Sequence, residues 1–176
     1  MSLFDLTGHV AIVTGGNGGI GLGMALGLAK AGASLAIVGR NADKNKIAIE
    51  KLQGMGATAI AIEKDITEEL AGTDVVTKVE DRFGRIDILI NNAGSNIRKR
   101  PEELSLNDFR WVQDTNLTSA FVFSQAVYPK FKTIGKGKII NIGSMYSIFG
   151  GAVSPACSVS KGGLIQMTKS MAAAWA

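Results

Sequence analysis

The sequence HVAIVTGGNGGIG, residues 9–21, decides the expected fold, because an apolar strand pattern runs directly into a glycine-rich loop. The segment that follows, Leu22–Ala31, has the spacing of a helix. In a strand–loop–helix unit of this kind, backbone N–H groups and the helix N-terminus face an anion. Side chains at Gly15, Gly19 or Gly21 would block the turn, the approach of a pyrophosphate or the packing of helix on strand. We therefore expect a nucleotide-binding loop; the alternative is that these glycines only form a turn.

The bulk composition is that of a globular chain with a buried core. Of its 176 residues, 46% are hydrophobic and 19% are charged, and the net charge is +4. We therefore expect one folded domain over residues 1–176. No apolar run approaches the ~20 residues of a membrane span, and residues 1–5 lack the basic region and long apolar core of a secretory signal. We expect a cytoplasmic protein with no membrane partner.

Two further features limit the function classes. Cys157 is the only cysteine, which argues against an internal disulfide or a multi-cysteine zinc site, and we expect no metal centre. The only basic run is Arg98–Arg100, and no aromatic residues lie between its charges to stack on bases. A solvated loop is therefore the preferred interpretation, and we expect no nucleic-acid partner.

Short apolar runs alternate with longer segments of helical period, which predicts a parallel sheet covered by helices on both faces. The predicted strands are rich in Ile and Val and apolar enough to be buried on both faces. They are Val10–Thr14, Ser34–Gly39, Thr58–Glu63, Ile86–Asn91 and Lys138–Gly143. The fold class is α/β, a Rossmann-type doubly wound parallel sheet.

The predicted helices follow each strand in turn. They lie near Gly19–Ala31, Ala42–Met55, Glu68–Phe83, Ser105–Lys132 and Pro155–Trp175. The fourth begins at a capping-box sequence, in which Ser105 caps the helix and Asp108 answers the Ser105 amide. The last residues, Lys169–Ala176, continue a helix pattern without a glycine C-cap. We therefore expect a domain truncated after five strand–helix units and incomplete at its C-terminus, with the fifth strand as an uncovered sheet edge.

These motifs together resemble the short-chain dehydrogenase/reductase family over the whole chain. Thr14–Gly21 is similar to the family's T-G-x-x-x-G-x-G loop, and Asn91–Gly94 to its N-N-A-G motif. The family's catalytic residues have counterparts at Asn116, Ser144 and Lys161.

Within the family, Asn96–Arg98 and Ile139–Ile148 look most like the gluconate and deoxygluconate dehydrogenases. The resemblance implies hydride transfer between a nicotinamide and a carbonyl or secondary alcohol, of a sugar acid or ketose. The substrate is then a small molecule.

The resemblance also implies a role for each matched residue. Ser144 would bind the substrate carbonyl, Lys161 would hold the nicotinamide ribose and lower the pKa of a proton donor, and Asn116 would anchor a water for proton relay. Asp65 would bind the adenine; the alternative is that it only caps a helix before Thr67. The implied cofactor-binding residues are Gly15, Asn17, Gly18, Gly19, Ile20, Gly21, Arg40, Asp65, Ile66, Asn91, Ala93, Gly94 and Lys161.

The end of the second predicted strand bears on the choice of cofactor. A site for NAD usually has an acid there to bind the ribose 2′-hydroxyl, whereas this chain has Gly39 followed by Arg40. Gly39 removes the repelling carboxylate, and the Arg40 guanidinium can grip a 2′-phosphate. We therefore expect NADP, with NAD possible. The alternative for Arg40 is a surface charge.

The chain departs from the family pattern where the proton donor belongs. The family has a tyrosine four residues before the lysine, and Cys157 stands at that position among the catalytic residues. Cys157 and Lys161 share a helix face, and both the ammonium and the helix N-terminus favour a thiolate. The sulfur ends short of the place of the tyrosine oxygen, so we expect impaired turnover. Tyr146 is near in sequence, but its spacing does not make it a substitute.

A covalent role for Cys157 would need a histidine partner. The only histidine, His9, opens the first strand at the sheet end opposite the ligand site, so a small buried hydrophobe is the preferred interpretation of Cys157.

Three interpretations of the whole chain stay open: a reductase, a catalytically inactive dinucleotide-binding or subunit-interaction protein, and a truncated product that does not fold stably alone. The basic run Arg98–Arg100 would attract a carboxylate-bearing substrate. A homodimer or homotetramer is expected from the resemblance, through side chains that can equally be core. These are Phe109, Val112, Phe121, Leu164, Met167 and Met171.

Overall fold

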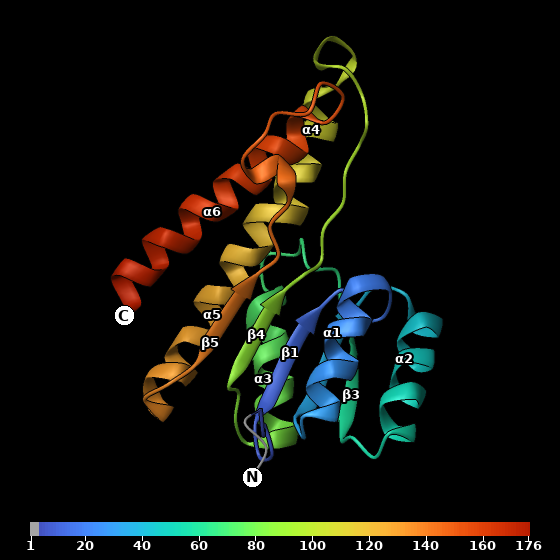
Figure 1. The fold of residues 1–176 in the computed structure, drawn as a ribbon, viewed down its shortest axis with the longest axis vertical. Helices are drawn as coiled ribbons and strands as arrows, with labels where there is room; N and C mark the ends of the chain where they lie inside the picture. The colour runs from blue at the N-terminus through green and yellow to red at the C-terminus, as the bar shows by residue number, and fades with distance from the viewer. Residues whose placement is uncertain (1–3) are drawn as a thin grey trace. The chain divides into compact units, whose positions relative to one another are not determined.

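A computed structural model describes residues 4–176 (Figure 1). Residues 1–3, on which part of the secretory-signal prediction rests, lie outside the described residues. The elements follow in the order β1 (Val10–Thr14), α1 (Gly19–Lys30), β2 (Ser34–Gly39), α2 (Ala42–Gly54), β3 (Ala59–Glu63), α3 (Ala71–Phe83), β4 (Ile88–Asn91), η1 (Pro101–Glu103), α4 (Leu106–Gln113), η2 (Asp114–Thr118), α5 (Ser119–Ile134), β5 (Lys138–Asn141), η3 (Met145–Ser147) and α6 (Pro155–Trp175). Within this described part, no helix combines the length and the apolar character that crossing a membrane requires.

The strands form one sheet in the order β3-β2-β1-β4-β5. The pairs of β1 with β2 and β4, and of β2 with β3, are parallel, with Ala11 opposite Leu35 on one side and Ile88 on the other. The chain therefore builds outward from β1 to β3 and then returns to place β4 on the other side of β1. This reversal is a topological switch point, where open α/β sheets bind ligands. The predicted α/β class is confirmed.

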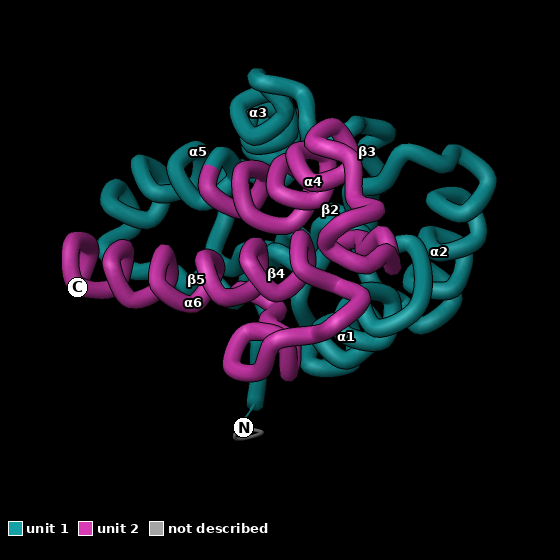
Figure 2. Tube along the Cα trace, turned by 90° about the horizontal axis from the view of Figure 1, so that it is seen from above, with its two compact units in different colours: residues 1–93, 122–140 teal, residues 94–121, 141–176 magenta. Residues whose placement is uncertain are grey.

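The described residues form two compact units, which Figure 2 colours separately. Of the described residues, the first comprises 4–93 and 122–140, and the second comprises 94–121 and 141–176. The first unit contains nearly all of the sheet, with α1, α2, α3 and most of α5. The second contains α4, η2, η3 and α6.

Alternating side chains give the sheet of the first unit two buried faces. On one face, Ile12 and Leu89 belong to a core that continues through Val75 of α3 and Phe123 of α5, all of them fully buried. The other face is covered by α1 and α2, which contact β1 and β2. At ~1.5–3 kcal/mol for each fully buried large apolar side chain, these faces dominate the stability of the unit.

The fourth predicted helix, Ser105–Lys132, is instead three consecutive segments. A π-helical stretch, η2, separates α4 from α5. The Asn116 side chain in this stretch is bonded to groups outside its own helix. Such bulges are frequent at functional sites, and helical periodicity alone does not reveal them.

Two detailed predictions were wrong. β5 is not buried on both faces, since Ile140 is 46% exposed at the sheet edge. β3 also exposes alternate residues, as at Glu63. The second error concerns the capping box of α4. The Ser105 hydroxyl does accept from the Asp108 amide at 3.1 Å, but the Asp108 carboxylate accepts from the Lys99 ammonium at 2.8 Å.

Asp87, through its buried carboxylate and its main-chain carbonyl, links the starts of three strands. Asp87, 4% exposed, accepts from the Val10 amide and from two nitrogens of Arg85. The Asp87 carbonyl also accepts from the amide of Lys138, the first residue of β5. Burial opposes ionisation of Asp87, but the Arg85 and Val10 hydrogen bonds together hold its pKa below the ordinary value.

We expect Asp87→Asn to lower the free energy of unfolding at pH 7 by about 1.5–3 kcal/mol, because charge-assisted hydrogen bonds are lost. The depressed pKa stabilises the fold above the unfolded value of about 3.9, and this contribution disappears as pH falls through the folded pKa. Urea unfolding from pH 7 to pH 3 should therefore show the two proteins converging. Asp81→Asn, at an exposed carboxylate, is the control, and a constant difference down to pH 3 would contradict the account.

Candidate functional site

The glycine-rich loop leaves the N-terminus of α1 open. Gly15 and Gly19 have positive φ values of 63° and 50°, which favour residues without a Cβ. The N-cap of α1 is Gly18, and no described side chain caps this end of the helix. Free N–H groups and the helix dipole therefore remain for an anion. The Ile20 side chain is 74% exposed, so any contribution it makes to an anion site comes from its peptide group.

Close packing at the switch point fixes this loop. A Cβ at Gly21 would lie 2.3 Å from the Gly15 carbonyl oxygen and 2.4 Å from the Asn92 amide nitrogen. That nitrogen donates to the carbonyls of Thr14, at 2.9 Å, and Gly15, at 3.3 Å. The Thr14 hydroxyl in turn accepts from the amides of Asn92 and Ala93. Asn92 was not among the predicted site residues, although it stands inside the N-N-A-G motif.

Asn91, the preceding residue, is a buried link within the first unit. It is 5% exposed, and its side chain donates to the Ser124 hydroxyl of α5 at 3.1 Å. Its predicted contribution to a nucleotide site therefore does not come from that donor.

At the end of β2, two amides fill the space over Gly39. The Asn17 side chain donates to Asn45 Oδ1 at 2.7 Å, and Asn45 Nδ2 donates to the Gly39 carbonyl at 2.9 Å. Asn17 was a predicted cofactor residue. Asn45 was not predicted, because nothing in the sequence pairs two asparagines that stand on different elements.

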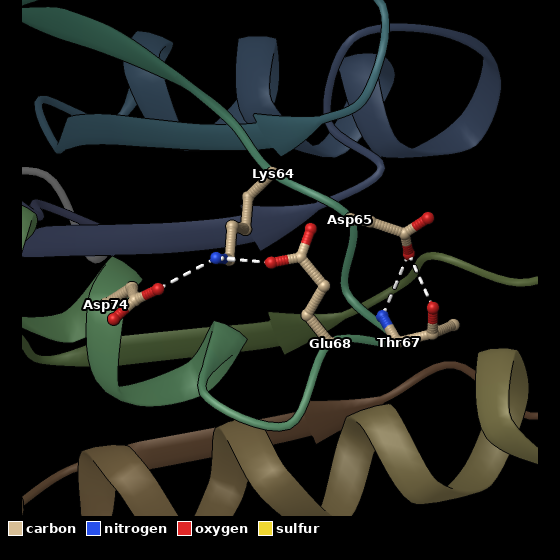
Figure 3. A network of polar contacts seen from close by, with 5 residues as sticks. All are labelled: Lys64, Asp65, Thr67, Glu68 and Asp74. Atoms are coloured by element: carbon tan, nitrogen blue, oxygen red, sulfur yellow. Dashed lines mark hydrogen bonds and ion pairs between the residues drawn. The ribbon is translucent and has the colours of Figure 1, made fainter.

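Arg40 and Asp65 lie on neighbouring loops and form a long ion pair of 3.5 Å. The Arg40 side chain is 63% exposed, so this contact contributes little to stability and leaves guanidinium donors for another partner. Asp65 Oδ1 accepts from both the amide and the hydroxyl of Thr67, as Figure 3 shows. Burial opposes ionisation of Asp65, but these bonds together with Arg40 lower its pKa.

Asp65 thus stabilises a turn at Thr67 and does not cap a helix, since α3 begins only at Ala71. The alternative prediction of a helix cap before Thr67 was therefore wrong. The other oxygen of Asp65, Oδ2, faces Arg40, so a role toward a nucleotide remains a prediction. Ile66, the next predicted residue, belongs to the core of the first unit.

A second network anchors the same loop to α3. The Lys64 ammonium contacts the carboxylates of Glu68 and, at 2.7 Å, Asp74 (Figure 3). The hydrogen bonds to Asp74 and Glu68 raise the pKa of Lys64. The backbone that carries Asp65 is therefore tied to the first turn of the helix that follows.

In the second unit, Asn116 connects the chain after β4 to helix α6. Its Oδ1 accepts from the Ser95 amide at 2.7 Å, and its Nδ2 donates to the Ser95 carbonyl and to the Ser160 hydroxyl. Both Asn116 donors are thus used inside the protein, so a direct side-chain role in a proton relay is limited to its oxygen. Ser95 and Ser160 are further site residues that the sequence did not predict.

Lys161 is the buried cation of this unit, with 8% exposure. Its ammonium donates to the Ile142 carbonyl at 2.6 Å. A Cβ at Gly94 would lie 3.6 Å from that ammonium and 3.1 Å from Asn116 Oδ1, so the structure brings these three predicted residues together. Burial lowers the pKa of Lys161, and Cys157 offsets this only in part.

Cys157 is 8% exposed, one helical turn before Lys161 on α6. Burial raises the pKa of its thiol, and the attraction of the Lys161 ammonium lowers it by less. The thiolate expected from the sequence is therefore wrong, because the helix-face argument took no account of desolvation. The interpretation of Cys157 as a small buried hydrophobe agrees with its place in the core.

Ser144 is the exposed N-cap of η3, a segment that contacts α6, and no described hydrogen bond joins its hydroxyl to Asn116 or Lys161. Its hydroxyl accepts from the Tyr146 amide at 3.2 Å, and its own amide donates to the Ser147 hydroxyl. The Tyr146 ring packs over Gly151, where a Cβ would lie 2.8 Å from it. No described hydrogen bond joins the Tyr146 ring to Cys157 or Lys161.

The remaining predicted features lie in several parts of the chain. In the basic run, Lys99 is paired with Asp108, while Arg98 and Arg100 are exposed. His9 precedes β1, at the end of that strand away from the glycine-rich loop. Among the six predicted contact residues between subunits, Val112 and Leu164 are buried in their own unit, whereas Phe121 is 44% exposed.

Comparison with known proteins agrees with this geometry. The model of the short chain dehydrogenase family matches residues 9–176. The 2-dehydro-3-deoxy-D-gluconate 5-dehydrogenase of Escherichia coli K12 is 40% identical over 177 residues, covering 100% of this chain and 69% of its own. The chain therefore belongs to the short-chain dehydrogenase family of oxidoreductases, and it spans about two thirds of the length of such relatives.

Solved structures show the same fold with different nucleotides. A candidate NAD(P)-dependent gluconate 5-dehydrogenase from Beutenbergia cavernae, with NADP bound at low occupancy, has a TM-score of 0.92 at 34% identity, covering 99% of this chain and 69% of that one. A xylitol dehydrogenase with bound NAD⁺ has a TM-score of 0.94 at 33% identity, covering 99% of this chain and 66% of that one.

The packing around Gly21 gives a direct test of the loop. Gly21→Ala puts a methyl group against the Gly15 carbonyl and the Asn92 amide, so we expect a stability loss of about 1–3 kcal/mol and at least tenfold weaker dinucleotide binding. Gly23→Ala is the matched control, because its Cβ meets nothing within 4 Å. Alanine should there raise helix stability by about 0.5–1 kcal/mol. Calorimetry on both variants measures their stability and their dinucleotide binding. Equal losses in Gly21→Ala and Gly23→Ala would refute the packing argument.

Proposed function

We propose that this protein binds NADP(H) through the glycine-rich loop and acts on a carbonyl or secondary alcohol of a sugar acid or ketose. The observation that carries the proposal is the open N-terminus of α1, held by Gly15 and Gly21 against the Asn92 side chain. Its amides suit a pyrophosphate, which would lie beside Gly18 and Gly19, where no other atom of the described residues fills the space.

The preference for NADP over NAD rests on the end of β2. Gly39 offers no carboxylate to bind a ribose 2′-hydroxyl or to repel a phosphate, and the exposed Arg40 guanidinium has donors to spare. Asp65 faces Arg40 and holds it near the loop. NAD stays a weaker alternative ligand, because the pyrophosphate contacts are common to both dinucleotides.

Arg40→Gln tests this preference. We expect NADPH to bind about 10–100-fold more weakly, as the loss of a charge-assisted hydrogen bond of about 1.5–3 kcal/mol implies, while NADH binding stays nearly unchanged. Isothermal titration calorimetry on the whole chain measures both affinities. Lys51→Gln, an exposed charge near the far end of α2, is the control. If NADPH and NADH binding were weakened equally, Arg40 would not determine the preference between the two cofactors.

For the chemical step, the second unit offers a buried ammonium but a poor proton donor. The bound nicotinamide would supply or accept the hydride. Lys161, with its lowered pKa, would hold a ribose hydroxyl, and Ser144 would bind the substrate oxygen. The Cys157 thiol stays protonated because burial raises its pKa, and its side chain is shorter than the tyrosine found there in the family. We therefore propose that turnover is impaired.

The exposed Arg98 and Arg100 support a substrate with a carboxylate, which their charge would attract. The E. coli relative is named for 2-dehydro-3-deoxy-D-gluconate, a sugar acid of the same substrate class. A second candidate function is a dinucleotide-binding or subunit-interaction protein without turnover, which Cys157 favours. Self-association would use the exposed Phe121 together with half-buried Phe109 and Met167.

Cys157→Tyr separates these two functions. General acids contribute about 10²–10⁴-fold to rate, so we expect the variant to reduce keto-sugar acids at least 100-fold faster than the natural chain. Cys157→Phe is the control, since phenylalanine has nearly the same volume as tyrosine but lacks its hydroxyl. Stopped assays of NADPH oxidation measure the rates, with thermal unfolding to verify that each variant is folded. If the natural chain turned over as fast as Cys157→Tyr, impairment would be disproved. Binding without turnover in every folded variant would favour the second function.

A further inference from the structure

Asn45 is a buried polar side chain on α2 for which the proposed function gives no role. It is 4% exposed, and a carboxamide in such a place destabilises the fold unless it is hydrogen-bonded. Its two described partners are the Gly39 carbonyl, at 2.9 Å, and the Asn17 amide nitrogen, at 2.7 Å. Asn45 therefore joins the end of β2 to the glycine-rich loop.

One main-chain atom fixes the orientation of both side chains. The Gly39 carbonyl can only accept a hydrogen bond, so Asn45 must direct Nδ2 toward it. The Asn45 Oδ1 then faces Asn17, which must offer an N–H in return. We call Asn17 and Asn45 the amide pair.

The amide pair occupies the space that a side chain at position 39 would need. A Cβ on Gly39 would lie 2.3 Å from Asn17 Nδ2, 2.9 Å from Asn17 Cγ and 2.9 Å from Asn45 Oδ1. A carboxylate there would also meet the negative end of the Asn45 amide dipole. The acid that binds an unphosphorylated ribose at the end of this strand is thus absent from the sequence, and a side chain at position 39 would fit only if Asn17 moved away.

We infer that Asn45 is a positioning residue for cofactor specificity. By holding Asn17 over Gly39, it keeps position 39 free of a side chain and reserves the place beside Arg40 for a ribose 2′-phosphate. This inference rests on the proposed binding of NADP(H) and extends it to a residue that touches no cofactor.

A double-mutant cycle on the whole chain tests the inference, with the NADPH-to-NADH affinity ratio from calorimetry as the readout. Gly39→Asp alone should weaken the binding of both dinucleotides without creating a preference for NADH, since the amide pair displaces the new carboxylate. In the Asn45→Ala background Asn17 can turn away. There we expect Gly39→Asp to shift the ratio toward NADH by at least tenfold more than it does alone. Additive effects of the two substitutions would overturn the inference.

Asn41→Ala is the matched control. Asn41 is the N-cap of the same helix and bonds to the Lys44 amide, with no described contact to Gly39. Its loss should weaken α2 and leave the effect of Gly39→Asp on the affinity ratio unchanged. Coupling as large as that of Asn45→Ala would assign the result to general loosening of the helix and overturn the inference.

Folding is checked by thermal unfolding of each variant. If Gly39→Asp is unfolded alone but folds together with Asn45→Ala, the steric argument is supported. If Asn45→Ala does not fold, Asn17→Gly relieves the same contact from the loop side and replaces it in the cycle. Failure of the natural chain to bind either dinucleotide would refute the proposed function. A natural preference for NADPH with additive variants would refute only the role of Asn45.

Discussion

The geometry of the candidate nucleotide site depends on the contact between the Asn92 side chain and the backbone of the glycine-rich loop. Asn92 bonds to the carbonyls of Thr14 and Gly15 at the switch point between β1 and β4. Gly21 packs against the same amide, so the start of α1 approaches the strand as closely as a Cβ-free residue allows. This contact places the N-terminus of α1 at the carboxyl end of β1, the central strand, where its amides suit an anion without the help of a charged side chain.

In the first unit, the candidate nucleotide site depends more on the space left for side chains than on charge. The glycine at position 39 removes a carboxylate, and the amide pair of Asn17 and Asn45 occupies the space that a side chain there would need. In the second unit, burial disfavours the charged form of two side chains. It lowers the pKa of Lys161, so the ammonium loses its proton more easily, and it raises the pKa of Cys157, so the thiol remains protonated. A family fold is thus retained while its proton-donating position is chemically altered.

The sequence predicted what local patterns encode. β1, β2 and α6 have the predicted bounds, because apolar runs end at glycine and a Ser-Pro pair starts the last helix. The contacts that define the site could not be predicted. They join residues 28, 44 and 78 positions apart, at Asn17–Asn45, Asn116–Ser160 and Thr14–Asn92. Burial at Cys157 and exposure at β5 likewise depend on packing, which the strand and helix periods do not specify.

The most direct test of the central claim follows the loop amides themselves. In a titration of ¹⁵N-labelled protein with NADPH, two-dimensional NMR reports each backbone N–H separately. The account predicts saturable shifts that are largest for residues 18–22, at the open end of α1. A folded protein whose amides at these positions stay unchanged at millimolar NADPH would contradict it.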